Sequence, residues 1–250
     1  LVNIVTKFVS HGIIGVYDEV RNILELEEND IVNVELEEYP ASLQLIINKI
    51  KGKKLTYDDT YRIVKDVIQG NLGEIEIAGF VLALNQQGVS LEDATNLSVA
   101  MYETGKQLKL GKKIILDKHS VGGVPGDKTT LLVVPIVAAA GFTIPKTSSR
   151  AITSAAGSAD RAEVLMPVNL DVDEMKRVVD ATNGCIVWGG DLYLSPADDI
   201  FVRVEYPLSI DPLLLPSIMS KKKSVGATHL VIDIPTGRGA KIKTIGEADL

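Results

Sequence analysis

The N-terminal residues alternate between apolar and polar side chains, which is the period of a β-strand. Residues 2–8 and 31–36 follow this alternation, and a short helix that Asp18 can cap is predicted between them. Nothing in this stretch carries chemistry. The pattern therefore predicts a small β-rich N-terminal domain over residues 1–38.

From residue 41 onward the apolar positions recur every three or four residues, as in amphipathic helices. Four helices are predicted, over residues 41–49, 56–68, 75–84 and 90–101. Two of them open on a capping box, Thr56 with Asp59 and Ser90 with Asp93. Short connections between helices are typical of a compact helical domain.

Beyond residue 110 short apolar runs alternate with loops and further helices. Strands are predicted at 114–116, 142–145, 185–188 and 229–233, and helices at 131–140, 171–179 and 217–223. Strands that alternate with helices indicate a mostly parallel sheet. The chain is therefore predicted to be an α/β protein, in which part of an α/β domain follows the β-rich and helical domains.

The loop at 117–130 concentrates groups that bind anions. Its glycines allow backbone amides to approach a ligand, and the helix that follows directs its N–H groups into the same space. Five side chains add donors: Lys118, His119, Ser120, Thr129 and Thr130. The loop is predicted to hold a phosphate, although a tight strand-to-helix connection is the plainer alternative. A nucleotide-triphosphate P-loop is excluded, because Gly122 and Gly126 are four residues apart and Asp127 precedes Lys128.

A second polar loop follows the next predicted strand. Six hydroxyl groups and the guanidinium of Arg150 lie between Lys146 and Ser158. Ligands of open α/β sheets bind outside the carboxyl ends of the strands, so the two loops can face one pocket. A solvated loop in which Ser158 caps a helix is the alternative.

Composition narrows the class of protein. An apolar fraction of 46%, a net charge of −7 and a pI of about 5.1 fit a globular protein and argue against a general nucleic-acid binder. The single cysteine, Cys185, excludes an intrachain disulfide and fits a reducing cytoplasm. No zinc site or membrane span is predicted. Because the chain begins at Leu1 and stops at Leu250 in a capped segment, we expect a fragment of a longer chain.

Three separated motifs resemble those of thymidine phosphorylase and its relatives. They are DKHSVGG at 117–123, SSR at 148–150 and SIMSKK at 217–222, in the order of that family. Variants of the motifs resemble the archaeal AMP phosphorylase branch more closely, namely GVPG at 123–126, TSSRAITS at 147–154 and SIDP at 209–212.

This resemblance implies a division into domains and a reaction. The helical domain would be discontinuous, formed by residues 39–108 and about 195–224, and the α/β domain would comprise 109–194 and 225–250. The reaction would be phosphorolysis of AMP and other nucleoside 5′-monophosphates to free base and ribose 1,5-bisphosphate, in nucleotide salvage. Inorganic phosphate and the nucleotide are the implied partners. The family also implies a homodimer or larger homo-oligomer, without cofactor or metal and without nucleic acid or membrane.

The resemblance also implies roles for individual residues. Catalytic roles fall to Asp211 and His119. The attacking phosphate would be bound by Lys118, Ser120, Thr130 and Ser148. AMP would be contacted by Gly123, Ser149, Arg150, Ala151, Ile152, Thr153, Ser154, Ser158, Ser217 and Lys241. Further base or sugar contacts would come from Arg203 and Lys221.

Asp211 would be the proton donor to the departing base, which requires a raised pKa in a closed, partly apolar cleft. Its local sequence, Asp211 before Pro212, equally fits a helix N-cap, and His119 is an alternative donor. Two other functions remain open. A pyrimidine nucleoside phosphorylase would ignore the 5′-phosphate, and a non-catalytic nucleotide-binding module would bind AMP without turnover.

Overall fold

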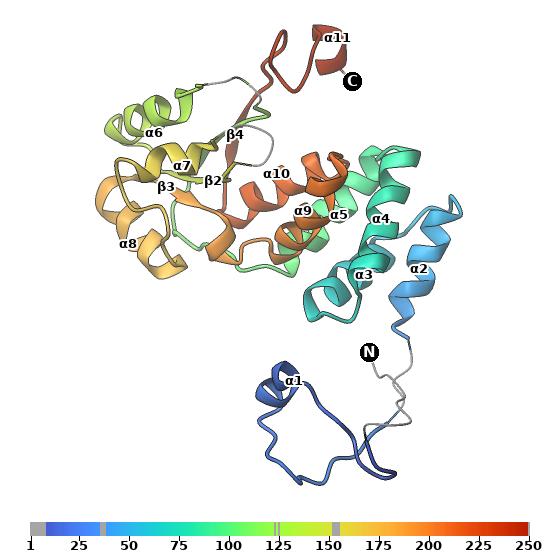
Figure 1. Cartoon of the computed structure of the whole chain (residues 1–250). Helices are drawn as coiled ribbons and strands as arrows, with labels where there is room; N and C mark the ends of the chain where they lie inside the picture. The colour runs from blue at the N-terminus through green and yellow to red at the C-terminus, as the bar shows by residue number, and fades with distance from the viewer. Residues whose placement is uncertain (1–8, 36–38, 123, 125, 152–155, 250) are drawn as a thin grey trace. The chain divides into compact units, whose positions relative to one another are not determined.

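A computed structural model describes residues 9–35, 39–122, 124, 126–151 and 156–249 (Figure 1). The chain divides into two compact units, residues 1–38 and 39–250.

The first unit contains one helix among its described residues, α1 (Asp18–Ile23). The strand predicted at 2–8 lies outside the described residues. The strand predicted at 31–36 is absent from residues 31–35, where Ile31 is fully exposed. Alternating side chains form a strand only when a second strand pairs with the backbone, and the described residues of this unit provide none.

The second unit opens with the four expected helices. They are α2 (Ala41–Ile50), α3 (Tyr57–Gln69), α4 (Glu74–Gln87) and α5 (Leu91–Glu103). Both predicted capping boxes are confirmed, since Thr56 accepts from the Asp59 amide and Ser90 from the Asp93 amide. Each cap contributes about 1 kcal/mol to helix stability.

Two later helices complete this helical part, α9 (Pro196–Leu208) and α10 (Leu214–Ser224). Phe201 of α9 is fully buried against Phe80 of α4, with ring centroids 6.1 Å apart. Ala197 and Leu213 join the same apolar core. Burying each phenyl ring contributes roughly 1.5–3 kcal/mol. Residues more than a hundred positions apart thus share one core, although the division into two domains stays a prediction.

Four parallel strands form the α/β part. They are β1 (Leu116–Ser120), β2 (Ile144–Ser148), β3 (Gly184–Trp188) and β4 (His229–Asp233). β1 pairs with β4 and β2 with β3, and a bridge between Ile115 and Thr143 links the two pairs, so the order is β4-β1-β2-β3. The accompanying helices are α6 (Thr129–Ala139), α7 (Ser158–Glu163), α8 (Val172–Thr182) and α11 (Ile245–Ala248), with a 3₁₀ turn η1 (Gly190–Leu192). This confirms the predicted α/β class with parallel strands.

The first two strands extend further toward their carboxyl ends than the apolar pattern predicts. Residues 117–120 were expected in the loop but belong to β1, where Ser120 pairs with Asp233 of β4. Likewise β2 continues through residues 146–148. Pairing with neighbouring strands decides these ends, because polar side chains are tolerated there when they face a site. The loops after β1 and β2 leave the same edge of the sheet, on the side of α9 and α10 (Figure 1).

We predict that Gly105→Ala destabilises the protein by about 1–3 kcal/mol, the range for overpacking a closed site. Gly105 follows α5, and a Cβ there would lie 2.1 Å from the Leu194 carbonyl oxygen. Urea unfolding followed by circular dichroism measures the change. Gly246→Ala is the matched control, since a Cβ at Gly246 meets nothing within 4 Å. Equal midpoints for the two variants would contradict the prediction.

Candidate active site

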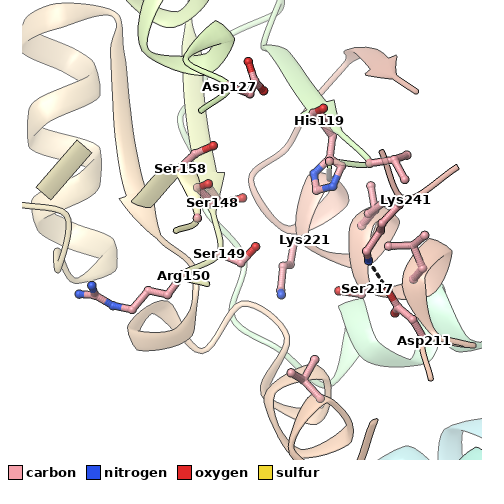
Figure 2. A pocket seen from close by; sticks show the side chains of 18 of the residues that line it. His119, Asp127, Ser148, Ser149, Arg150, Ser158, Asp211, Ser217, Lys221 and Lys241 are labelled. Carbon is pink, nitrogen blue, oxygen red and sulfur yellow. Dashed lines mark hydrogen bonds and ion pairs between the residues drawn. The ribbon is translucent and has the colours of Figure 1, made fainter. Parts of the chain in front are cut away.

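A cavity of about 930 Å³ lies between the carboxyl ends of the strands and helices α9 and α10. The α/β part contributes residues of β1, β2 and the loops that follow them, and the helical part contributes one face of α9, α10 and their connection. The lining includes the predicted residues His119, Ser120, Thr130, Ser148, Ser149, Arg150, Ser158, Asp211, Ser217, Lys221 and Lys241. Figure 2 shows the serines of the second loop facing His119, Lys221 and Lys241.

Three consecutive residues at the end of β1 carry enclosed polar atoms. Lys118 Nζ, His119 Nδ1 and Ser120 Oγ make no hydrogen bond with any described residue. Lys118 Nζ lies 3.4 Å from the Asp233 carboxylate, and Lys118 is not part of the cavity lining. Enclosed polar groups normally have partners, so the groups of His119 and Ser120 are suited to a ligand. A direct phosphate contact by Lys118 is not supported by its position.

The His119 imidazole is neutral in this arrangement. Burial lowers its pKa to about 2, and the charges of Lys146, Lys222, Lys221 and Lys118 act in the same direction. A neutral ring can donate a hydrogen bond to an oxyanion or accept one, but it holds no proton to give near pH 7. The lowered pKa favours a hydrogen-bonding role for His119, and the alternative that it supplies a proton stays a prediction.

Two buried lysines to which the sequence analysis gave no role, Lys146 and Lys222, line the cavity. Lys222 Nζ is 2.9 Å from Asp117 Oδ2, and neither side chain is more than 3% exposed. Lys146 donates to the Thr147 carbonyl, and its pKa is lowered well below the usual value by burial and by the nearby Lys222. The lysine run 221–223 resembled a solvated helix end from its sequence, but only Lys223 is exposed.

Lys221 faces the cavity from α10 and donates to Asp198 of α9. Burial alone would lower the pKa of Lys221, but the charge of Asp198 and its hydrogen bond outweigh burial and raise it. Lys221 thus stays cationic at neutral pH. Its position fits the expected contact with base or sugar.

The second loop is closed by one carboxylate. Asp160 Oδ2 accepts from the amides of Ala151, at 2.7 Å, and Gly157, at 2.8 Å. A Cβ at Gly157 would lie 2.2 Å from the Ser149 carbonyl oxygen, so the two ends of the loop touch. Desolvation acts to raise the pKa of Asp160, but the two amides and Arg150 outweigh it and lower the pKa. These hydrogen bonds of Asp160 hold the loop so that Ser149 lines the cavity.

Arg150 is turned away from the anion-binding groups (Figure 2). Its guanidinium donates to both oxygens of Glu163, at 2.6 and 2.9 Å, to Asp160 at 3.1 Å, and stacks 4.8 Å from the centre of the Trp188 ring. The hydrogen bonds to Glu163 raise the pKa of Arg150 further. In this arrangement the Arg150 guanidinium does not point at the anion-binding groups, and its contact with the substrate phosphate stays a prediction. Its donors are already occupied by carboxylates.

Arg161 of α7 also lines the cavity, although no motif singled it out. Its guanidinium donates to the Asp127 carbonyl and, at 3.0 Å, to the Ala156 carbonyl. It thereby ties the β1 loop to the second loop. An arginine at the fourth position of a short helix carries no recognisable signal, so only the fold reveals it.

Asp211 lies across the cavity from the serines of the second loop and accepts a hydrogen bond from Lys241 (Figure 2). α10 begins at Leu214 without a side-chain cap, so the alternative that Asp211 caps this helix is not observed. The pair joins the helical part, which carries Asp211, to the segment after β4, where the Lys241 amide contacts Gly122. Both predicted residues thus meet at one end of the site.

Glu205 is a third cavity carboxyl and was not predicted. It is 5% exposed, and its Oε1 accepts from the Leu213 amide at 3.1 Å. Burial raises the pKa of Glu205 to about 7, with additional contributions from Asp211 and Asp198. The sequence gives no sign of this raised pKa, because it comes from burial of Glu205 among residues of other segments.

The remaining predicted residues lie elsewhere. Ala151 and Arg203 are exposed and do not line the cavity. The resemblance implied a base or sugar contact for Arg203, but Arg203 lies on an exposed face of α9. Four residues predicted to contact AMP lie outside the described residues: Gly123, Ile152, Thr153 and Ser154.

Among the described residues, no helix is long and apolar enough to cross a membrane, and no group of histidine, cysteine or acidic side chains could hold a metal ion.

Comparison with known proteins gives matches along nearly the whole chain. Residues 112–250 match the family described as "Glycosyl transferase family, a/b domain", and residues 43–105 match "Glycosyl transferase family, helical bundle domain". An AMP phosphorylase of Thermofilum pendens is 56% identical over 99% of this chain, and one of Methanocaldococcus jannaschii is 50% identical over 97%. The alignments cover 48% of each relative, so the chain spans about half the length of these proteins. The resemblance to AMP phosphorylases is thus confirmed.

A solved structure supports the fold. Anthranilate phosphoribosyltransferase from Thermus thermophilus superposes with a TM-score of 0.66 over 76% of this chain and 57% of its own. Its sequence identity is 21%, so the likeness concerns the fold alone.

We predict that His119 does not titrate between pH 5 and 8 in the unliganded protein. Its pKa of about 2 reflects burial and four lysines, and a phosphate dianion in the cavity would offset those charges and raise the pKa. The ring carbon shifts in NMR spectra, recorded with and without phosphate, measure both states. A midpoint near 6.5 without phosphate would contradict the assignment.

We predict that Arg150→Ala lowers turnover of nucleotide and nucleoside substrates by similar factors, because its role is to hold the second loop. Losing its bonds to Asp160 and Glu163 should also lower the melting temperature by a few degrees. Steady-state kinetics and thermal unfolding measure these effects. The matched control is Arg177→Ala, an exposed arginine of α8. A loss confined to the phosphorylated substrate would restore Arg150 as a phosphate ligand.

Proposed function

Because the chain belongs to the glycosyl transferase family with a helical bundle and an a/b domain, we propose that it is an AMP phosphorylase. It transfers the ribose 5-phosphate group of AMP, and of other nucleoside 5′-monophosphates, from the base to inorganic phosphate. The products are the free base and ribose 1,5-bisphosphate. The observation that carries this proposal is one cavity that brings the hydroxyl and cationic groups of the β1 and β2 loops together with Asp211 and Lys241.

The cavity is suited to two anions. Lysine and arginine side chains surround it from both walls: Lys146, Arg161, Lys221, Lys222 and Lys241. Hydroxyl groups stand among them, with Thr130 at the start of α6 and Ser148 at the end of β2. A helix start adds free amide groups and a positive dipole end. The cavity thus offers hydrogen-bond donors both to an attacking phosphate and to the 5′-phosphate of a nucleotide.

The transition state of phosphorolysis resembles an oxocarbenium ion between the attacking phosphate and the departing base. Ser120, Thr130, Ser148 and neutral His119 hold the attacking phosphate against the sugar carbon C1′. Ser149, Ser158, Ser217 and Lys241 contact the nucleotide, and Lys221 contacts its sugar or base. Fixed donors stabilise the developing charge without reorganising, which is the main source of catalysis in such sites.

The departing base must be protonated, because adenine leaves poorly as an anion. We assign this proton to Asp211, which lines the cavity and accepts a hydrogen bond from Lys241 (Figure 2). General acids of this kind accelerate reactions by roughly 10²–10⁴-fold.

We further propose a cytoplasmic role in nucleotide salvage and a homodimeric or larger assembly. The single cysteine is a buried free thiol, which suits a reducing compartment. The helical part exposes apolar side chains such as Ile75 and Leu91, which a second copy could cover.

The deciding experiment compares AMP, adenosine and thymidine as substrates with phosphate present. We expect adenine and ribose 1,5-bisphosphate from AMP, with adenosine and thymidine turned over at least tenfold less efficiently because each lacks the second anion. Chromatography of the products measures this. Preference for thymidine would indicate a pyrimidine nucleoside phosphorylase, and AMP binding without turnover would indicate a non-catalytic module.

In the same assay we predict that Asp211→Asn lowers kcat by about 10²-fold or more, the scale of a lost general acid. The melting temperature should change little, since Asp211 caps no helix and its ion pair is partly exposed. AMP binding should be largely retained. Near-normal turnover of the variant would remove Asp211 from the acid role.

A further inference from the structure

Lys146 of β2 differs from the other lysines that line the cavity in having no carboxylate partner. Four described lysines line it: Lys146, Lys221, Lys222 and Lys241. The last three each form an ion pair with one carboxylate: Lys221 with Asp198, Lys222 with Asp117 and Lys241 with Asp211. Within the described part of the chain, Lys146 forms no ion pair. Its amine is therefore left to an anion that enters the cavity.

The amine of Lys146 is withdrawn from solvent. The residue is 3% exposed, and its Nζ donates to the backbone carbonyl of its own neighbour, Thr147. An ammonium group has three N–H donors, and a neutral carbonyl does not balance its charge. A buried cation is normally paired with an anion, because an isolated charge in a protein interior is strongly destabilising. The described residues provide no such anion for Lys146.

The groups around this amine are mainly other lysines. Burial is the largest cause of its lowered pKa, Lys222 and Lys118 act in the same direction, and Asp117 opposes them. Asp117 is already paired with Lys222, at 2.9 Å, so one carboxylate faces two buried amines. A phosphate dianion beside Lys146 would supply the missing negative charge and stabilise the protonated amine.

Lys146 stands among the groups to which the proposed function assigns the attacking phosphate. It precedes Ser148 by two residues on β2, and side chains two apart on a strand point to the same face of the sheet. After burial, its charge is the largest cause of the lowered pKa of His119 on β1. Nδ1 of His119 and Oγ of Ser120 are enclosed atoms without a described hydrogen-bond partner. One amine and several neutral polar groups thus line the same part of the cavity.

The lysine that the family motif indicates, Lys118, is placed differently. Its Nζ lies 3.4 Å from the carboxylate of Asp233 on β4, and it is not part of the cavity lining. Lys146 combines the two properties that Lys118 lacks, since it lines the cavity and has no carboxylate of its own among the described residues. The structure therefore favours Lys146 over Lys118 as a cation for the ligand.

We infer that Lys146 is a further phosphate-binding residue, whose ammonium group contacts the inorganic phosphate that attacks C1′. This rests on the proposed function, which assigns hydroxyl groups and His119 to that phosphate. In the free protein the amine donates to the Thr147 carbonyl. A bound phosphate accepts a hydrogen bond from the same amine and provides its counter-ion, so the anion is held between β1 and β2.

The first test measures phosphate binding without turnover. Isothermal titration calorimetry with inorganic phosphate compares the full-length protein with its Lys146→Met variant, in which a chain of similar length carries no charge. We expect the Kd for phosphate to rise about tenfold or more, because a charge-assisted contact is lost. Lys112→Met is the matched control, since Lys112 is a half-exposed lysine near Asp180, and it should bind phosphate as the wild type does.

Thermal unfolding of the same variants without phosphate separates a binding role from a structural one. The melting temperature of Lys146→Met should equal or exceed that of the wild type, because a buried amine without a counter-ion is replaced by an apolar side chain. A phosphate Kd equal to that of the wild type overturns the inference, whether or not the protein is an AMP phosphorylase. Weaker binding together with a melting temperature lowered by several degrees also overturns it, in favour of a structural role.

The second test separates the two anions of the reaction. KM is measured for phosphate at saturating AMP, and for AMP at saturating phosphate. In Lys146→Met we expect KM for phosphate to rise about tenfold or more, while KM for AMP changes by less than about threefold. A change confined to KM for AMP would assign Lys146 to the 5′-phosphate and overturn the inference.

The outcomes also separate the inference from the proposed function. Phosphate binding that depends on Lys146, without AMP turnover in the wild type, sinks the function and leaves the phosphate contact standing. Normal AMP turnover with unchanged phosphate affinity in Lys146→Met does the reverse. If Lys146→Met fails to fold, a crystal structure of the wild type with inorganic phosphate decides. A phosphate oxygen in hydrogen-bond contact with Lys146 Nζ supports the inference, and a phosphate bound away from Lys146 overturns it.

Discussion

One buried ion pair holds the two walls of the cavity together. Lys222 reaches from α10 to Asp117 of β1 across 2.9 Å, and both side chains are withdrawn from solvent. Removing one partner of such a pair leaves an isolated buried charge, at a cost of about 3–5 kcal/mol. Because α10 belongs to the helical part and β1 to the sheet, the pair fixes the helix that carries Ser217 and Lys221 opposite the strand that carries His119.

Other lysines besides Lys222 gather around His119, and their charges act on the neighbouring groups. Lys146 and His119 both have lowered pKa values, through burial first and then through the surrounding lysines. A buried base that cannot find a counter-ion gives up its proton instead. A phosphate dianion supplies the missing counter-ion, so the cavity favours anions before any specific contact forms.

Carboxyl groups line the same cavity. Asp211 and Glu205 are among its lining residues, together with the ammonium group of Lys241. A glycosyl transfer to phosphate needs both kinds of group, since an anion must approach one side of the sugar carbon while a proton is delivered to the base on the other. The combination of charges in the cavity, more than any single residue, links the fold to the proposed reaction.

The sequence alone determined the local elements and the chemistry of the first loop. Capping boxes such as Thr56 with Asp59 depend on residues three positions apart, and β4 has the predicted bounds because its apolar run is continuous. The motif residues at 117–120 and 217–222 were also recognisable, since their resemblance lies in contiguous residues. Local signals of this kind can be recognised in the sequence without knowledge of the fold.

Only the tertiary structure decided which of these side chains meet. It turned Arg150 toward Glu163, buried Lys222 near a helix end, and buried Glu205 where its carboxylate accepts from the Leu213 amide. It also extended β1 through Ser120, because β4 pairs with it from more than a hundred residues away. Burial and long-range pairing set the direction and the protonation of a side chain, and neither is written in the residues next to it.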